Sequence, residues 1–353
     1  MKATIAVLPG DGIGPEIVAK STDLLSVIAE KFGHEFTFVE GLIGGIAIDE
    51  TGDPLPAETV KICENADAIL MGAVGGPKWS DPTATVQPER GLLELRQHFG
   101  LFANLRPVKA YPALVEHAPL RAELLQDVDI LFVRELVSGI YFGERQEQGD
   151  GDSSYDTMTY SRSEVEQVAN VAFRAAQGRR GKLCSVDKAN VLATMRLWRR
   201  TVVDVHEEYA DVELEHLLVD AATMHLLTRP GSFDVIVAGN MFGDILSDEA
   251  SVLAGSLGML PSASLRADQF GLYEPVHGTA PDIAGQGIAN PIGMFLSAAM
   301  LLRYSLQLED EASAIEAAVD AALDAGLRTA DIASPGQASA STDEFAAAVI
   351  RHL

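Results

Sequence analysis

Two aspartates stand four residues apart in the segment 240–248, which follows an apolar stretch at 233–238 that is typical of a buried strand. If a helix begins after that strand, Asp244 and Asp248 lie on one helix face, near the helix end that carries positive charge. Two carboxylates so placed repel each other unless a cation lies between them, and with water they make a site for a hard divalent cation. Acidic residues are also common near helix N-termini, so both interpretations stay open. Asp220 is a third candidate, because an acid in a largely apolar segment needs a partner.

Three arginines could bind an anionic substrate. Arg134 ends a buried strand expected at 129–133, and Arg96 and Arg106 stand in the segments 91–96 and 104–107. A guanidinium group matches a carboxylate with two parallel hydrogen bonds. Taken singly, each arginine is more often explained by a structural salt bridge.

Lys188 and Tyr141 are the candidate groups for proton transfer. Lys188 follows a strand expected at 183–187, and it is the kind of residue whose pKa a site can tune. Tyr141 lies in the segment GIYFG, where it could equally pack in the core.

Strands and helices must alternate to bring these residues together. Strands are also expected at 3–8 and 68–71, and a helix with apolar residues at helical spacing follows Pro15. This alternation predicts an α/β protein with a largely parallel sheet. The glycines at 10, 12 and 14 suggest a Rossmann phosphate loop, but the position that should hold its third glycine is Pro15. We therefore expect a tight turn at a strand end, where a ligand can still bind.

Composition narrows the possible partners. The chain has 353 residues, enough for two domains, and its 51 acidic against 26 basic residues give a net charge of -25. Such an acidic chain repels nucleic acid. The longest apolar run, 291–302, is too short to cross a bilayer and suits a buried helix.

Two cysteines, Cys63 and Cys184, make no disulfide framework and fit a reducing compartment. The apolar start meets Pro9 too early for a signal sequence. We expect a cytoplasmic protein with no membrane partner. The polar segment 143–163 alternates at 155–160 like an exposed strand, which predicts a protruding hairpin, and an amphipathic helix is expected after 308.

Longer motifs, found in order along nearly the whole chain, resemble one enzyme family. They are LPGDGIGPE at 8–16, RE at 134–135 with GIYFGE at 139–144, VDKANV at 186–191, GNMFGDILSD at 239–248, and EPVHGTAPD at 274–282 with ANP at 289–291. The family is that of the metal-dependent β-decarboxylating dehydrogenases of 2-hydroxy acids, which includes isocitrate, isopropylmalate, homoisocitrate and tartrate dehydrogenases.

The resemblance implies a fold of two α/β domains with a mixed, largely parallel sheet, which is not a Rossmann fold. The first domain would be made of 1–101 plus 256–353, on the cofactor side, and the second of 102–255. The second would carry the metal ligands, a homodimer interface and an intersubunit arm around 145–163. The active cleft would lie between the domains.

The resemblance also implies roles for single residues. Arg96, Arg106 and Arg134 would bind the substrate carboxylates, and Asp220, Asp244 and Asp248 would bind Mg²⁺ or Mn²⁺. Tyr141 and Lys188, with Asp220, would form the catalytic set, and Lys188 and Asp220 would be lent across the homodimer interface. The cofactor-binding residues would be Ile13, Gly76, Glu89, His277, Gly278, Ala280, Asp282 and Asn290. A carboxylate at Asp282 would bond the adenosine ribose and repel a 2′-phosphate, which favours NAD over NADP.

The segment PERGLLELR at 88–96 resembles the specificity helix of the members that use isopropylmalate. Leu92, Leu93 and Val191 would contact the isopropyl group, and leucines there would leave the third carboxylate of isocitrate unpaired. The implied reaction is the NAD-dependent oxidative decarboxylation of 3-isopropylmalate to 2-oxo-4-methylpentanoate, CO₂ and NADH, in leucine biosynthesis. A tartrate, malate or homoisocitrate relative stays open. So does a non-catalytic regulatory subunit, against which the intact catalytic and metal-binding set weighs.

Overall fold

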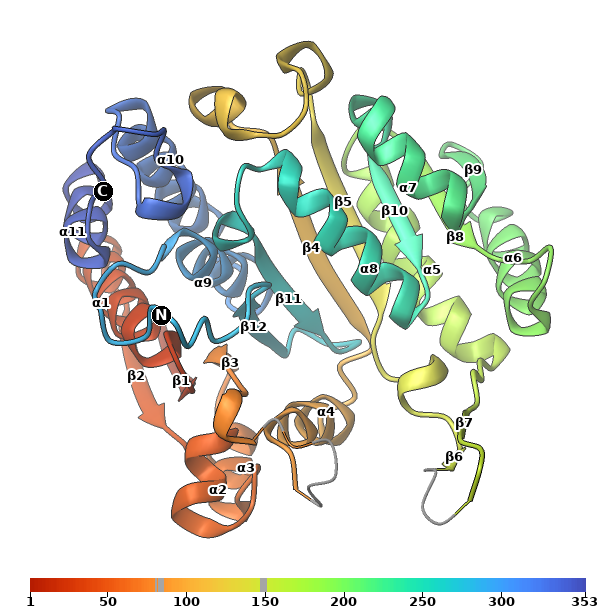
Figure 1. Ribbon diagram of the computed structural model, residues 1–353, viewed down its shortest axis with the longest axis horizontal. Helices are drawn as coiled ribbons and strands as arrows, with labels where there is room; N and C mark the ends of the chain where they lie inside the picture. The colour runs from red at the N-terminus through yellow and green to blue at the C-terminus, as the bar shows by residue number, and fades with distance from the viewer. Residues whose placement is uncertain (80, 82–85, 147–150) are drawn as a thin grey trace. The chain divides into compact units, whose positions relative to one another are not determined.

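Figure 1 shows a computed structural model of the chain, which describes residues 1–79, 81, 86–146 and 151–353. The chain folds into two units. The first consists of 1–99, 111–117 and 255–353, and the second of 100–110 and 118–254. Both chain ends therefore belong to the first unit. The short segment 111–117 joins it as well, where the Arg328 guanidinium donates a hydrogen bond of 2.6 Å to the carbonyl of Ala113.

Five strands form the sheet of the first unit, in the order β2-β1-β3-β12-β11. They are β1 (Lys2–Gly10), β2 (Glu35–Glu40), β3 (Ala68–Ala73), β11 (Pro261–Leu265) and β12 (Gly271–Pro275). All neighbours run parallel except β11 and β12. Strand β3 is buried along its whole length, and β1 nearly so, which explains their continuous apolar sequences. The strands expected at 3–8 and 68–71 are confirmed.

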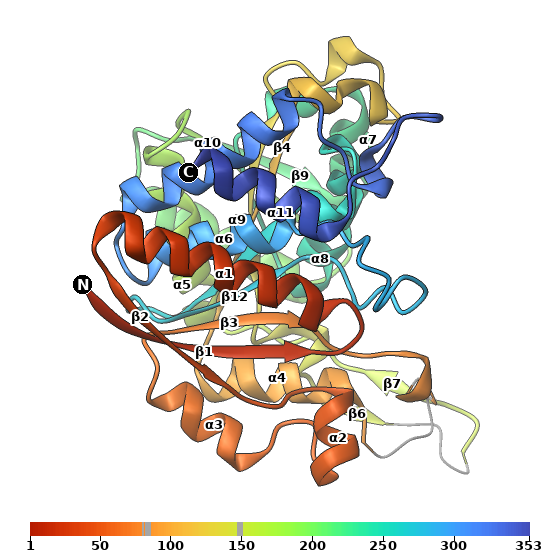
Figure 2. The same ribbon diagram turned by 90° about the vertical axis from the view of Figure 1, so that its left-hand side faces the viewer.

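Helices cover both faces of this sheet (Figure 2). They are α1 (Gly14–Phe32), α2 (Gly45–Thr51), α3 (Ala57–Glu64), α4 (Pro88–His98), α9 (Ile292–Tyr304), α10 (Glu309–Asp324) and α11 (Thr342–His352). Helix α1 contacts α9 and α11, and α9 packs against β11 and β12, while α2 and α3 contact β1. Helix α9 is buried from Ile292 to Leu302, as its apolar sequence predicts.

The main sheet of the second unit has five strands among the described residues, in the order β4-β5-β10-β8-β9. They are β4 (Ala103–Lys109), β5 (Asp129–Glu135), β8 (Lys182–Asp187), β9 (Glu213–Leu218) and β10 (Val235–Ala238). Strand β4 is antiparallel to β5, and the other neighbours are parallel. The mixed, largely parallel α/β fold is thereby confirmed.

Four long helices complete this unit: α5 (Arg162–Gln177), α6 (Ala193–His206), α7 (Val219–Thr228) and α8 (Asn240–Ala250). Helix α5 contacts β5, β8 and β10 and also packs against α6. Helix α8 contacts β4, β5 and β10, and α7 packs against α8. The carboxyl end of β10 therefore leads straight into α8, the helix that carries two of the candidate metal ligands.

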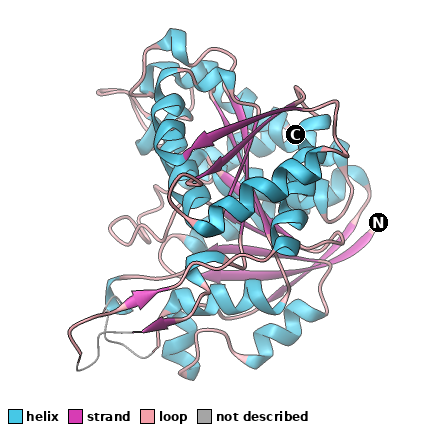
Figure 3. Cartoon of the chain, turned by 90° about the vertical axis from the view of Figure 1, so that its right-hand side faces the viewer, coloured by secondary structure: helices cyan, strands magenta, loops and turns pink. Residues whose placement is uncertain are grey.

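The polar segment after residue 143 forms a hairpin shorter than predicted. Strand β6 (Arg145–Gln146) pairs antiparallel with β7 (Tyr155–Asp156), and these are the two short arrows at the lower left of Figure 3. The exposed strand expected to continue to Tyr160 is wrong, because the Tyr160 ring is buried edge-on against Trp198, at a centroid distance of 5.5 Å. The part of the predicted arm at 147–150 lies outside the described residues.

Among the described residues, no helix combines the length and the apolar character needed to span a membrane.

Candidate functional site

The two aspartates of α8 face one arginine, as their spacing predicts. Nη1 of Arg106 lies 3.0 Å from Oδ1 of Asp248, and Nη2 lies 3.3 Å from Oδ1 of Asp244. The expected position near the positive helix end is wrong, because α8 already begins at Asn240 and has no acidic residue in its first turn. The positive charge that lies between the two carboxylates is therefore the Arg106 guanidinium of β4, and the N-terminus of α8 does not supply it.

Arg134, at the end of β5, is the second cation of this cluster. It is 3% exposed, and its Nη1 contacts Asp244. Its Nε and Nη2 donate to Oδ1 of Asn240, at 3.1 and 2.8 Å. Arg106 is also buried and donates to Oδ1 of Asn104 and to the Ser247 hydroxyl, each at 2.8 Å. Both arginines are held by neutral polar groups as well as by carboxylates, so they can bind an anion without moving far.

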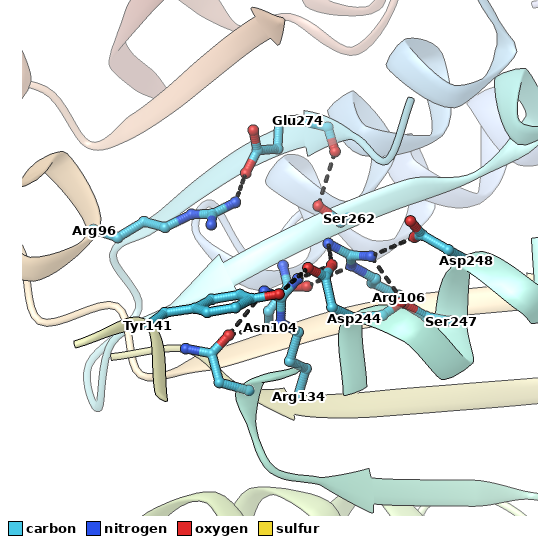
Figure 4. Close-up of polar contacts among 11 residues, drawn as sticks. Arg96, Asn104, Arg106, Arg134, Tyr141, Asp244, Ser247, Asp248, Ser262 and Glu274 are labelled. Atoms are coloured by element: carbon cyan, nitrogen blue, oxygen red, sulfur yellow. Dashed lines mark hydrogen bonds and ion pairs between the residues drawn. The ribbon is translucent and has the colours of Figure 1, made fainter. Parts of the chain in front are cut away.

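Tyr141 ends a short 3-10 helix, η4 (Gly139–Tyr141), and its hydroxyl donates to Oδ2 of Asp244 at 3.2 Å. Figure 4 shows Tyr141, Arg106 and Arg134 converging on that carboxylate. The Arg134 guanidinium carbon lies 5.9 Å from the centre of the tyrosine ring. Partial burial raises the pKa of the Tyr141 hydroxyl, Asp244 raises it further, and Arg134 opposes the increase. A phenol that stays protonated at neutral pH can act as a proton donor.

The pKa of the Asp248 carboxyl is raised, although the groups around it act in opposite directions. Loss of contact with water raises its pKa, Arg106 lowers it and Asp244 raises it. A bound divalent cation would favour the ionised form of both aspartates.

Lys188 and Asp220 form a pair of their own. Lys188 directly follows β8, Asp220 lies in the first turn of α7, and their side chains are 2.5 Å apart. The hydrogen bond from Lys188 lowers the pKa of the Asp220 carboxyl. Among the residues that the structure describes, no three His, Cys, Asp or Glu side chains come together as a metal site. One chain thus places Asp244 with Asp248, and Asp220 with Lys188.

Arg96 belongs to the first unit, where it lies on α4. Its Nη2 contacts Oε1 of Glu274 at 2.6 Å, and both side chains are buried (Figure 4). Leu92 and Leu93 lie half-buried on the same helix. Val191 is a residue of the second unit and is 62% exposed.

The glycine-rich turn after β1 is held by the Asp11 carboxylate, which is buried. That carboxylate accepts hydrogen bonds from the backbone nitrogens of Gly45, Ile46 and Gly75, at 2.7, 2.7 and 2.9 Å. Gly75 directly precedes Gly76 in the sequence. The Glu89 side chain lies close to Gly75, with an oxygen 2.7 Å from where a Cβ on Gly75 would lie. Asp11 therefore connects the turn to Gly75, which lies next to the candidate Gly76 and close to the candidate Glu89.

Ile13 ends the same turn, and its backbone nitrogen donates to the Thr279 carbonyl at 2.9 Å. This bond joins the turn to the segment 277–282, which contains four of the candidate cofactor residues: His277, Gly278, Ala280 and Asp282. Ala280 has a φ of 38°, a conformation that non-glycine residues rarely adopt.

His277 is buried, and its Nδ1 lies 2.8 Å from the Gly278 carbonyl, whereas its Nε2 has no partner. Burial lowers the pKa of His277. The neutral ring donates from Nδ1 to the carbonyl and leaves Nε2 as an acceptor. Asp282 is exposed.

Asn290, the remaining candidate cofactor residue, is buried and bonded on both sides. Its Nδ2 donates to Oδ2 of Asp331 at 3.0 Å, and its Oδ1 accepts from the backbone nitrogen of Ile292 at 3.0 Å. With its amide so occupied, the Asn290 side chain fixes the segment before α9.

Four residues at these sites were not among the sequence candidates: Asp11, Asn240, Glu274 and Asp331. The first three stand inside the motifs that drew attention to their neighbours. The sequence gives no signal for Asn240, because an amide carries no charge. It gives none for Glu274 either, because its partner Arg96 lies 178 residues away.

Comparison with known proteins agrees with the geometry. Residues 4–349 match the isocitrate/isopropylmalate dehydrogenase family. The chain is 56% identical to the 3-isopropylmalate dehydrogenase of Rhodopirellula baltica, over 100% of this chain and 99% of that one. It is 55% identical to the protein of the same name from Bacillus subtilis, over 99% and 98%.

Solved structures agree as well. The isocitrate dehydrogenase of Methylococcus capsulatus superposes with a TM-score of 0.88 at 31% identity, over 99% of each chain. A β-decarboxylating dehydrogenase of Thermococcus kodakarensis gives a TM-score of 0.79 at 36% identity, over 99% of this chain and 96% of that one.

Proposed function

The chain belongs to the isocitrate/isopropylmalate dehydrogenase family, and on that premise we propose that it oxidises and decarboxylates 3-isopropylmalate, yielding 2-oxo-4-methylpentanoate, CO₂ and NADH in leucine biosynthesis. The observation that carries the proposal is the identity of 55–56%, over nearly the full length, to relatives named for this activity. The buried arginines around Asp244 supply the matching chemistry for a dicarboxylate substrate.

Arg106 and Arg134 would bind substrate carboxylates in place of the aspartates that they now contact. Both are buried and partly held by neutral groups, so an anion gains charge-assisted hydrogen bonds without a large loss of side-chain freedom. Arg96 would bind a further carboxylate oxygen, sharing its guanidinium with Glu274. On the same helix, Leu92 and Leu93 suit an isopropyl group better than a third carboxylate. Val191 is proposed as a further contact to that group.

Lys188 and Tyr141 would move the two protons of the reaction. Lys188 would take the proton of the C2 hydroxyl as hydride leaves C2, directly or through Asp220. Loss of CO₂ from the neighbouring carboxylate then leaves an enolate, which takes a proton from the Tyr141 hydroxyl at C3. One proton is removed and one is returned. Asp244, which accepts a hydrogen bond from the phenol, orients it.

Asp244, Asp248 and Asp220 would hold Mg²⁺ or Mn²⁺, because carboxylate oxygens are the ligands that these hard cations take. Their donor set fits, since Asp248 is 56% exposed on its side chain and Asp244 lies one helical turn before it. When bound, the metal would acidify the substrate hydroxyl and stabilise negative charge on its oxygen. Asp220 would be supplied by a second copy of the chain, as would Lys188.

The first unit would hold NAD at Ile13, Gly76, Glu89, His277, Gly278, Ala280, Asp282 and Asn290. The orphaned Nε2 of His277 supports this, because a buried acceptor fits a donor such as the exocyclic amine of adenine. The cofactor would supply the hydride acceptor. The exposed carboxylate of Asp282 favours ribose hydroxyls over a 2′-phosphate, and hence NAD over NADP.

A homodimer is proposed from exposed apolar side chains on the two helices that carry the aspartates. Met224 and Leu227 on α7 are 65% and 38% exposed, and Ile245 on α8 is 54% exposed. Helices α7 and α8 pack against each other, so these side chains belong to neighbouring elements. A second copy that covered them would bury apolar surface and bring Lys188 and Asp220 to the other active site.

The deciding experiment is a substrate panel. Purified protein is assayed with 3-isopropylmalate, isocitrate, homoisocitrate, tartrate and malate, each with Mn²⁺ and either NAD or NADP. We expect kcat/KM to be highest for 3-isopropylmalate with NAD, by at least about tenfold over the other substrates. Losing one or two apolar contacts to the isopropyl group lowers kcat/KM by about this factor. Higher turnover of another malate would reassign the substrate. A protein that is inactive with every member of the panel would contradict the proposed activity.

A further inference from the structure

The side chain of Asn240 has no role in the chemistry above, yet it is only 1% exposed and bonds to two other elements. Its oxygen accepts from Nε and Nη2 of Arg134. Its Nδ2 donates to the backbone carbonyl of Ser138 at 3.1 Å. Asn240 thus connects the first residue of α8 to the end of β5 and to the loop that follows β5.

The backbone of Asn240 is held too. Its nitrogen donates to the Tyr160 hydroxyl at 2.8 Å, and the same hydroxyl lies 2.4 Å and 2.8 Å from the positions that a Cβ on Gly139 or Gly239 would occupy. Such distances leave no room for a side chain at either glycine. The surroundings of Asn240 are therefore closely packed, and its amide has one orientation that satisfies both neighbours.

These bonds act on three groups of the proposed site. With Nε and Nη2 of Arg134 held by Asn240, Nη1 contacts Asp244. Ser138 directly precedes η4, so the bond to its carbonyl fixes the start of the turn that carries Tyr141. Asp244 lies four residues after Asn240, and its direction follows from where α8 begins.

We propose that Asn240 is a positioning residue, which sets Arg134, Tyr141 and Asp244 against one another. The proposal rests on the proposed function, in which these residues bind the substrate carboxylate, protonate C3 and bind the metal. Only an amide suits the place, because one end must accept from a guanidinium group while the other donates to a carbonyl. An aspartate has no donor there, and an apolar residue has neither group.

Asn240→Asp and Asn240→Ala separate the contact with Arg134 from the bond to the Ser138 carbonyl. The aspartate keeps an acceptor for Arg134, now with a negative charge, but turns a carboxylate oxygen toward the Ser138 carbonyl. The bond it loses is therefore the one to the start of the Tyr141 turn. We expect its kcat to fall at least about tenfold while the dissociation constant of 3-isopropylmalate stays within about threefold. The alanine loses the bonds to both neighbours, and we expect kcat to fall and the dissociation constant to rise, each about tenfold or more.

The dissociation constant is measured by calorimetry with Mn²⁺ and without NAD, so that no turnover occurs. Kinetics are run on whichever malate the wild-type protein uses, so that a wrong substrate assignment is separated from a wrong role for Asn240. The matched control is Asn170→Ala. Asn170 lies on α5 of the same unit, and its amide is likewise bonded at both ends. Its Nδ2 donates to the Glu166 carbonyl, and its Oδ1 accepts from the Tyr209 hydroxyl.

We expect Asn170→Ala to lower the melting temperature with kcat and substrate affinity unchanged. The proposal is overturned if both Asn240 variants keep wild-type kcat and affinity per folded molecule. It is also overturned if Asn240→Asp and Asn240→Ala have the same kinetic defect, because the two bonds would then have no separate effects.

Discussion

At the scale of single residues, Arg106 and Arg134 are proposed to determine what the site binds. Two guanidinium groups are buried beside Asp244, so the chain keeps positive charge at one place although its net charge is -25. A dianionic substrate and a divalent cation together bring no net charge into this cluster. The site can therefore hold both without leaving an uncompensated charge in partly buried surroundings.

We propose that the choice between NAD and NADP depends on one exposed side chain, Asp282. Asp282→Lys removes a carboxylate that would bond two ribose hydroxyls and adds a cation that attracts a 2′-phosphate. Hydrogen bonds to charged groups contribute about 1.5–3 kcal/mol, so the ratio of kcat/KM for NAD over NADP should fall about 10- to 100-fold. Steady-state kinetics with both cofactors measure this ratio.

Glu123→Lys is the matched control for Asp282→Lys, since it makes the same charge change at another exposed acid. We expect it to leave the cofactor ratio unchanged. An unchanged ratio in Asp282→Lys itself would remove Asp282 from the cofactor site.

At the scale of elements, the end of β5 carries a buried acid that makes stability depend on pH. Burial raises the pKa of Glu135 to about 7 from 4.5, although the backbone nitrogens of Val137 and Ser138 donate to its carboxylate and oppose the increase. The folded state therefore binds more protons than the unfolded state between these values. Unfolding free energy should fall as pH rises through that window, by on the order of 3 kcal/mol.

Glu135→Gln cannot ionise and should lose this dependence. Urea unfolding of the wild-type protein and of Glu135→Gln at pH 5 and pH 8 measures how the free energy of unfolding depends on pH. Glu30→Gln, on the exposed side of α1, is the control and should keep the pH dependence of the wild type. Parallel behaviour of wild type and Glu135→Gln would show that Glu135 ionises normally in the folded chain.

The helices and strands were largely predictable from the sequence, but where they begin and end and which distant residues they contact were not. Apolar runs and helical spacing predicted β1, β3, β5, β10 and α9, because burial on both faces leaves a continuous apolar sequence. The alternation of polar and apolar residues at 155–160 predicted an exposed strand. That prediction was wrong at Tyr160, because its ring packs on Trp198. The helix start at Asn240 depends on the Tyr160 hydroxyl, 80 residues away, and local sequence does not report such a partner.

At the scale of the whole molecule, the proposed sharing of active sites can be tested by mixing two inactive variants. Lys188→Ala and Asp244→Asn should each be inactive. A mixed dimer then has one site with both residues intact and one with neither, so unfolding and refolding an equal mixture should restore roughly a quarter of the activity. No recovery would mean that Lys188 and Asp244 serve the same site from one chain.

Light scattering of the wild-type protein should give twice the chain mass of 37.6 kDa. Ile245→Asp should lower that mass, because it places a charge among the exposed apolar side chains of α7 and α8. Val203→Asp on α6, where the valine is 45% exposed, is the control and should stay a dimer.

The first unit contains both ends of the chain, and this affects how the protein folds during synthesis. Strand β3 pairs with β12, which lies about 200 residues later in the sequence and so leaves the ribosome later. Pairing between such distant segments slows folding. The second unit is complete by residue 254 and can form first. Until β12 arrives, β3 has an open apolar edge, a ready template for pairing with another nascent chain. Early release of the polypeptide before residue 271 would leave that edge uncovered, so aggregation should begin in the half of the protein that starts the chain.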